Sequence, residues 1–129
     1  MKNILVAEDN AVNRELVREL LETHGYSVFE ASNGQEALQM ITESIPDLLL
    51  LDLGMPVLDG FGVIRQVRDN PAWATLPVLA LTAYAMQGDR DRIIGSGFHG
   101  YLSKPINSGA LLKELTRLLE TRDSCEQQE

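Results

Sequence analysis

The stretch DLLLLDLGMP, residues 47–56, decides the fold class of this chain. It is a run of leucines between two aspartates, followed at once by a loop that contains Gly54 and Pro56. A strand that is apolar on both faces is typical of the centre of a parallel sheet with helices on both sides. Burying the carboxylate of Asp52 beside so much apolar surface is costly unless another group compensates it. We therefore predict that Asp52 ends a central strand and belongs to a site.

The rest of the chain alternates short apolar runs with amphipathic stretches, which predicts strands and helices in turn. In addition to 47–52, strands are predicted at Ile4–Ala7, Tyr26–Glu30, Pro77–Thr82 and Phe98–Leu102. Helices are predicted at Asn10–His24, Gly34–Glu43, Phe61–Arg68, Ala85–Ile94 and Asn107–Glu120. This alternation predicts an α/β fold, a doubly wound five-stranded parallel sheet with five helices and right-handed crossovers. The first, third and fourth strands are the most apolar and should be central.

The first helix shows the expected signals most fully. Asn10 is a suitable N-cap, and Gly25 supplies the left-handed conformation that stops a helix. Its apolar residues recur at helical spacing, and we expect them to form its apolar stripe: Val12, Leu16, Val17, Leu20 and Leu21.

Length and charge limit the class of protein. The chain has 129 residues, of which 44% are hydrophobic, and this predicts one domain over 1–120 followed by a polar, disordered tail over 121–129. The formal charge of -8 opposes nucleic acid as a direct partner. No apolar segment approaches the ~20 residues of a membrane helix, so we expect no membrane insertion. A single cysteine suits a reducing compartment, and we expect a cytoplasmic protein.

Polar side chains stand where several of the predicted strands end. Glu8 and Asp9 follow the first strand, Asp52 ends the third, Thr82 ends the fourth and Lys104 follows the fifth. Ligand sites of open α/β sheets lie beyond the carboxyl ends of the strands. We therefore expect these five residues to meet in one site.

The residue types indicate the chemistry of that site. Three clustered carboxylates repel one another, which would raise a pKa or require a cation. With oxygen ligands only, that cation should be Mg²⁺ or Mn²⁺. A carboxylate can itself act as a nucleophile and form an aspartyl phosphate. Asp52 is the central candidate, and Lys104 and Thr82 can stabilise charge on the phosphoryl oxygens.

With these residues identified, the chain resembles a two-component response-regulator receiver domain over about Lys2 to Glu120. The resemblance lies in four motifs in order, ILVAEDN (4–10), LLLLDLGMPVLDG (48–60), ALTA (80–83) and YLSKP (101–105). It implies the flavodoxin-like strand order 2-1-3-4-5. It also implies a signalling protein rather than an enzyme, which accepts a phosphoryl group from a histidine kinase or histidine phosphotransfer protein. Few residues follow the last predicted helix, so we expect this protein either to act on a downstream protein in trans or to be one piece of a longer chain such as a hybrid kinase.

The resemblance assigns roles to individual residues. Asp52 corresponds to the phosphoacceptor. The metal is expected at Glu8, Asp9, Asp52 and the carbonyl of Gly54, with Glu8 acting through water. Lys104 corresponds to the cation of the site.

Further roles concern the response to phosphorylation. Thr82 and the amide of Ala83 are expected to approach the phosphoryl group, and Tyr101 to turn inward as the second switch residue. The bond from Lys104 to Pro105 is expected to be cis. We expect the signalling surface to be formed by the helix at 85–94, the fifth strand and the last helix.

Ile106 argues against a symmetric dimer typical of DNA-binding regulators, so we expect a monomer or a weak phosphorylation-dependent dimer.

Three other functions compete with this one. A haloacid-dehalogenase-like phosphatase uses the same nucleophile but needs a second acid where this chain has Gly54. A flavodoxin-like FMN binder needs a phosphate loop where this chain has Glu8 and Asp9. The third is a phosphorylation-independent interaction module, which would not need the complete set of acceptor residues.

Other polar and aromatic residues receive structural interpretations. We expect Asp59 to cap a helix, His24 and His99 to pack or cap, and Trp73 to anchor a loop.

Overall fold

A computed structural model of the chain describes residues 2–55, 57–82, 87–104 and 106–127. Its sheet is parallel throughout, with the order β2-β1-β3-β4-β5, so both the predicted order and the central position of the first, third and fourth strands are confirmed. The strands are β1 (Asn3–Ala7), β2 (Ser27–Ala31), β3 (Leu48–Asp52), β4 (Val78–Thr82) and β5 (Gly100–Ser103).

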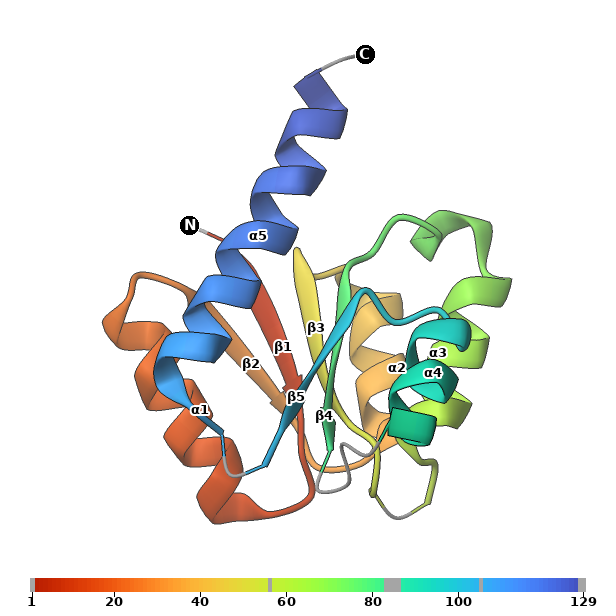
Figure 1. The fold of residues 1–129 in the computed structure, drawn as a ribbon, viewed down its shortest axis with the longest axis horizontal. Coiled ribbons are helices and arrows are strands. Elements are labelled where there is room, and N and C mark those ends of the chain that lie inside the picture. Colours follow the sequence, from red (N-terminus) through yellow and green to blue (C-terminus); the bar gives the residue numbers. More distant parts are fainter. Residues whose placement is uncertain (1, 56, 83–86, 105, 128–129) are drawn as a thin grey trace.

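Helices cover both faces of this sheet. They are α1 (Ala11–Thr23), α2 (Gly34–Glu43), α3 (Gly60–Asp69), the 3-10 turn η1 (Pro71–Trp73), α4 (Gln87–Gly95) and α5 (Ser108–Gln127). Figure 1 shows α1 and α5 on one face and α2, α3 and α4 on the other. The doubly wound α/β fold is therefore confirmed.

The leucine run of β3 explains why the sheet needs helices on both faces. Leu48 and Leu50 belong to the core that includes residues of α1 and α5, whereas Leu49 and Leu51 belong to the core that includes residues of α2 and α3. All four are fully buried. Because successive side chains of a strand point to opposite faces, a run of leucines fills two cores at once.

Local signals set the starts of three helices as their sequences indicate. The side-chain oxygen of Asn10 accepts a hydrogen bond from the N–H of Asn13 at 3.0 Å. Asn33 and Asp59 cap α2 and α3 in the same way, at 2.8 Å each. Such caps satisfy amides that the first turn of a helix leaves free. The capping role predicted for Asp59 is therefore confirmed.

The end of α1 also follows its sequence. His24 is the C-cap residue, and its Nδ1 lies 2.9 Å from the carbonyl oxygen of Leu20, which agrees with the predicted capping role. Gly25 follows with φ of +88°, the left-handed conformation in which glycine carries no steric penalty.

The predicted apolar stripe of α1 was wrong at two positions. Val17 and Leu21 are buried and Leu20 packs against the same core, but Val12 is 65% exposed and Leu16 is 59% exposed. The helix therefore buries a narrower stripe than its sequence contains, because only the Val17 and Leu21 side of α1 faces the sheet. Two large apolar side chains remain at the surface.

The boundaries of other elements differ from the predictions as well. The last helix was predicted to end at Glu120, which was wrong because α5 continues to Gln127, and residues 121–127 contain neither Gly nor Pro to stop it. The turn η1 was not predicted. Its Trp73 packs partly buried against the core, in agreement with the expected anchor. The predicted start of the fourth helix, 85–86, lies outside the described residues, and the division at residue 120 stays a prediction.

Arg68 joins three segments at the amino ends of the strands. Its guanidinium donates to the carbonyl oxygens of Gly97 at 2.9 Å, Leu76 at 3.1 Å and Ala74 at 3.4 Å. Burial lowers the pKa of this arginine from its ordinary value. Arg68 thereby holds α3 against the loop before β4 and against the chain that leaves α4.

Candidate functional site

The carboxyl ends of the strands carry the predicted polar residues into one cleft. Its volume is about 710 Å³, and Glu8, Asp9, Asp52, Thr82 and Lys104 all line it. Three of them are buried, since Glu8 is 1% exposed, Asp52 5% and Thr82 4%. Buried polar groups need partners. The clustering predicted from the strand ends is therefore present in the structure.

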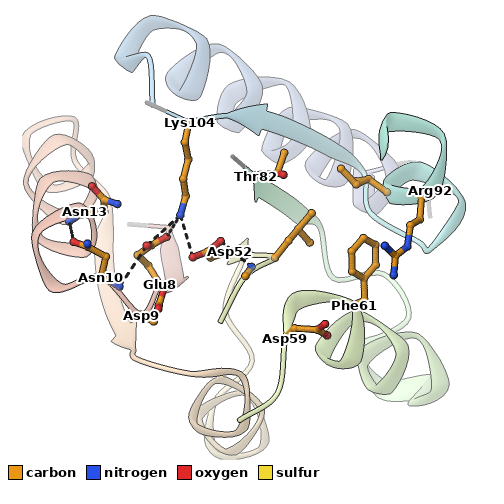
Figure 2. Close-up of a pocket in the computed structure, with 13 residues that line it drawn as sticks. Glu8, Asp9, Asn10, Asn13, Asp52, Asp59, Phe61, Thr82, Arg92 and Lys104 are labelled. Atoms are coloured by element: carbon orange, nitrogen blue, oxygen red, sulfur yellow. Dashed lines mark hydrogen bonds and ion pairs between the residues drawn. The ribbon is translucent and has the colours of Figure 1, made fainter. Parts of the chain in front are cut away.

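Lys104 supplies the positive charge at the centre of the cleft (Figure 2). Its Nζ lies 3.0 Å from Oδ2 of Asp52 and 3.0 Å from Oε2 of Glu8. Its backbone N–H donates to the carbonyl oxygen of Thr82 at 2.7 Å, which extends the pairing of β4 with β5 by one residue. Because both carboxylates favour the charged ammonium, the pKa of Lys104 is raised despite the opposing effect of burial.

Asp52 is held as an ionised carboxylate. Burial alone would raise its pKa, but the N–H of Gly54 donates to Oδ1 at 3.1 Å and Lys104 adds an opposite charge, so the pKa of Asp52 is lowered. The first residue of α3 approaches this strand end closely. A Cβ on Gly60 would lie 2.8 Å from the carbonyl oxygen of Asp52, so only glycine fits there without displacing the loop.

The same surroundings shift the pKa of Glu8 in the opposite direction. Burial raises its pKa, the Asp52 carboxylate adds to this, and Lys104 opposes both. The pKa of Glu8 is therefore raised while that of Asp52 is lowered. The backbone of Glu8 is held by Arg14, whose Nη1 donates to the Glu8 carbonyl oxygen at 2.9 Å.

The three acids fit a hard divalent cation. One carboxylate oxygen from each of Glu8, Asp9 and Asp52 lies within 4.8 Å of the others. Oε2 of Glu8 is buried and accepts no hydrogen bond within the described structure, although the Lys104 ammonium lies 3.0 Å away. An oxygen-only donor set with one buried oxygen that lacks a hydrogen bond suits Mg²⁺ better than a softer metal. These acids could hold such an ion, which would supply positive charge next to the Asp52 oxygens.

The structure describes only some of the other predicted site residues. Gly54 lines the cleft, and its predicted role as a metal ligand stays a prediction. Tyr101 is half-buried and packs against the core on the face of the sheet that carries α2 and α3. Ala83 and Pro105 lie outside the described residues, so the predicted amide contact and the predicted cis bond are not described.

The far wall of the cleft holds Phe61 and Arg92, which were not predicted as site residues. Phe61 of α3 lines the cleft, and the guanidinium carbon of Arg92 on α4 lies 4.0 Å from the centre of its ring. Phe61 also meets Phe98 edge to face, with ring centres 6.2 Å apart. Phe61 and Arg92 were predicted to lie on two separate helices, and only the contact between α3 and α4 brings their side chains together.

A second hollow adjoins the cleft beside α1. It has a volume of about 350 Å³ and is mainly apolar, and its lining includes Leu16, Leu20 and Ile106. Asn13 and Lys104 line both this groove and the acidic cleft. The exposed Leu16 of α1 therefore lies in a groove that adjoins the acidic site.

Comparison with known proteins identifies the family. The family model of the response regulator receiver domain matches residues 4–116. The chain belongs to the response regulator receiver family. This agrees with the resemblance of its four motifs, and it does not favour the phosphatase alternative. Membership places this receiver among signalling proteins.

Relatives of this receiver include several named response regulators. The polar-differentiation response regulator DivK of Brucella anthropi is 41% identical over 106 residues, which cover 82% of this chain and 86% of DivK. The chemotaxis protein CheY4 of Vibrio cholerae is 32% identical with a TM-score of 0.86, covering 92% of this chain and 98% of CheY4.

A third relative bears on the metal. The receiver domain of the sensor histidine kinase PA1611 from Pseudomonas aeruginosa PAO1 is 34% identical with a TM-score of 0.86, covering 92% of this chain and 98% of that domain. Its structure contains a magnesium ion coordinated in the active site cleft.

In the part of this receiver that the structure describes, no helix has both the length and the apolar character that crossing a bilayer requires.

Proposed function

We propose that this receiver accepts a phosphoryl group on Asp52 in a Mg²⁺-dependent reaction and passes the signal to another protein through the surface formed by α4, β5 and α5. The observation that carries the proposal is the ionised, central Asp52, held by Gly54 and Lys104 beside Glu8 and Asp9. Asp9, Asp52 and the Gly54 carbonyl are the proposed metal ligands, with Glu8 acting through water.

The proposed reaction uses the residues of the cleft directly. One Oδ of Asp52 forms a bond to phosphorus while the bond from phosphorus to the imidazole nitrogen of a phosphohistidine donor breaks. The imidazole leaves with the electron pair and takes up a proton. Lys104 stays close to the new phosphoryl oxygens, and the Thr82 hydroxyl and the Ala83 amide are proposed to donate to them.

The experiment for this proposal is covalent labelling. Incubation with acetyl phosphate and Mg²⁺ should add one acid-labile phosphoryl group, which mass spectrometry should place on Asp52. Turnover of small phosphate esters without accumulation of an adduct would support a phosphatase instead.

Metal binding should depend on Asp9. Titration with Mg²⁺, followed by amide NMR, should shift the signals of residues 8–10 and 52–55, and Asp9→Ala should abolish these shifts because it removes a carboxylate from the cluster. Asp69→Ala, which removes an exposed carboxylate at the end of α3, is the control and should bind Mg²⁺ normally. Equal affinity in the two variants would exclude Asp9 as a ligand.

Phosphorylation should move the segment that follows Thr82. The new phosphoryl group adds charge and acceptor oxygens, Thr82 moves toward them, and Tyr101 turns inward to fill the space. Ile93 is the only buried side chain among those described in α4, so the helix is weakly held and a modest free energy can shift it. Beryllofluoride, which imitates the phosphoryl group, should change amide exchange from residue 84 to residue 104.

The control for this switch is Thr82→Ala. It should still bind beryllofluoride but should leave the 84–104 amides unchanged. If beryllofluoride binds the unmodified receiver and these amides stay as they were, Asp52 serves as a phosphate store and the switch is excluded.

The groove beside α1 is the proposed docking place for the phosphohistidine protein. Its apolar lining and the exposed Leu16 suit an apolar helix of the donor, and its shared wall with the cleft would bring the phosphohistidine to Asp52. Leu16→Ala should slow transfer from a phosphorylated phosphotransfer protein about tenfold, because truncating a central apolar contact typically removes one to two kcal/mol.

Two controls separate docking from chemistry. Acetyl phosphate should label Leu16→Ala at the normal rate, since a small donor does not use the groove. Ile45→Ala, at an exposed apolar residue outside the groove, should accept phosphate from the protein donor normally. Equal slowing with both donors in Leu16→Ala would contradict the docking assignment.

A further inference from the structure

Arg92 is a cation of the cleft wall that the proposed reaction has not used. It projects from α4 and lines the same cleft as Asp52 and Lys104. Figure 2 shows its guanidinium against the ring of Phe61, on the side of the cleft away from Glu8 and Asp9. The residue is exposed, so the side chain has room to move.

Three carboxylates of the cleft already bind other groups, so Arg92 is available to bind an anion. Lys104 already pairs with Glu8 and Asp52 at 3.0 Å each. Asp59, the other acid near Phe61, accepts the amide of Gly62 at 2.8 Å as the cap of α3. Arg92 forms no ion pair with any carboxylate that the structure describes.

The present partner of Arg92 is a weak one. A guanidinium over a half-buried aromatic ring such as Phe61 gains less than it would from two charge-assisted hydrogen bonds to a phosphoryl group. The planar fork of arginine matches two phosphoryl oxygens at once, which lysine cannot do. A phosphoryl group that enters the cleft therefore offers Arg92 a better partner than Phe61.

We propose that Arg92 is a positioning residue for the phosphoryl group, which leaves the ring of Phe61 and binds the phosphoryl oxygens of the donor on the side opposite Lys104. The proposal rests on the proposed function of Asp52. It identifies the anionic phosphoryl oxygens as the group recognised. Because α4 carries Arg92, the same movement ties the position of α4 to the presence of phosphate.

The test is the rate of Asp52 labelling by acetyl phosphate at fixed Mg²⁺ and ionic strength, below saturation. Arg92→Gln should lower the second-order rate constant about tenfold, since it removes charge-assisted hydrogen bonds. Arg92→Lys should recover part of the rate because it restores the charge without the fork. Arg65→Gln removes the same charge from the exposed face of α3 outside the cleft, and it should label at the normal rate.

Phe61→Leu separates positioning from simple packing. It removes the ring on which Arg92 lies, so a positioning role predicts labelling as fast as in the unmodified receiver or faster. A structural role of the contact predicts equal slowing in Phe61→Leu and Arg92→Gln. Thermal unfolding of each variant shows whether it is folded.

The outcomes distinguish the two proposals. An unmodified receiver that labels on Asp52, together with a normal rate in Arg92→Gln or equal slowing in Phe61→Leu, overturns the role of Arg92 alone. An unmodified receiver that never labels on Asp52 overturns the proposed function, and the role of Arg92 with it.

Discussion

Asp52→Asn should abolish phosphoryl acceptance completely. The amide keeps the shape of the side chain and can still accept the N–H of Gly54, but it carries no charge and is not a nucleophile toward phosphorus. After incubation with acetyl phosphate and Mg²⁺, mass spectrometry should find the adduct on the unmodified receiver and none on the variant. The expected change is therefore from stoichiometric labelling to none.

Asp59→Asn is a matched control for this substitution. Asp59 lines the same cleft, but its carboxylate caps α3, and asparagine is an equally good cap. It should label normally. An adduct that persists in Asp52→Asn, at Asp59 or at any other acid, would show that the acceptor is a different residue.

Arg68→Ala should cause the largest loss of stability among the substitutions considered. It removes the donors to the carbonyl oxygens of Gly97, Leu76 and Ala74, of which the first two form part-buried hydrogen bonds. Hydrogen bonds to charged groups contribute about 1.5–3 kcal/mol each, and partial replacement by water reduces their sum. We expect the free energy of unfolding to fall by roughly 3 kcal/mol.

Urea unfolding, followed by the fluorescence of the single tryptophan, measures this loss. Trp73 lies in η1, next to the segment that Arg68 holds, so it reports directly on this end of the molecule. Arg65→Ala, one turn earlier on the exposed face of α3, should change stability by less than about 0.5 kcal/mol. Similar midpoints and slopes for the two variants would mean that the Arg68 hydrogen bonds contribute nothing net.

Arg68 also bears on how α4 can move. It holds the carbonyl of Gly97 just beyond the end of α4, and Gly97 has φ of +108°, so this end of the segment is fixed to α3. Near the cleft the described helix is attached to α3 by the contact of Arg92 with Phe61. Both contacts lie at the carboxyl end of α4, since Arg92 belongs to its last turn, so release of Arg92 from Phe61 would leave Arg68 to hold this end against α3.

Much of the fold was predictable because its signals are local. The apolar run 48–51 requires two covered faces wherever it lies, since the alternation of side chains along a strand depends on the backbone alone. Asn10, Asn33 and Asp59 cap their helices through bonds to amides three residues away. The residue types at the strand ends likewise indicated carboxylate and phosphoryl chemistry before their positions were known.

By itself, therefore, the sequence determined the alternation of strands and helices, the sheet edge at which the site lies and the chemical character of that site. Only the tertiary structure decided which charges meet. Lys104 contacts Glu8 across 96 positions of the chain, Arg92 reaches Phe61, and Arg68 reaches Gly97. It also decided that Val12 and Leu16 stay exposed. The physical reason is that periodicity and caps act within a few residues, whereas side chains on separate elements meet only after the sheet has set the distance and direction between them.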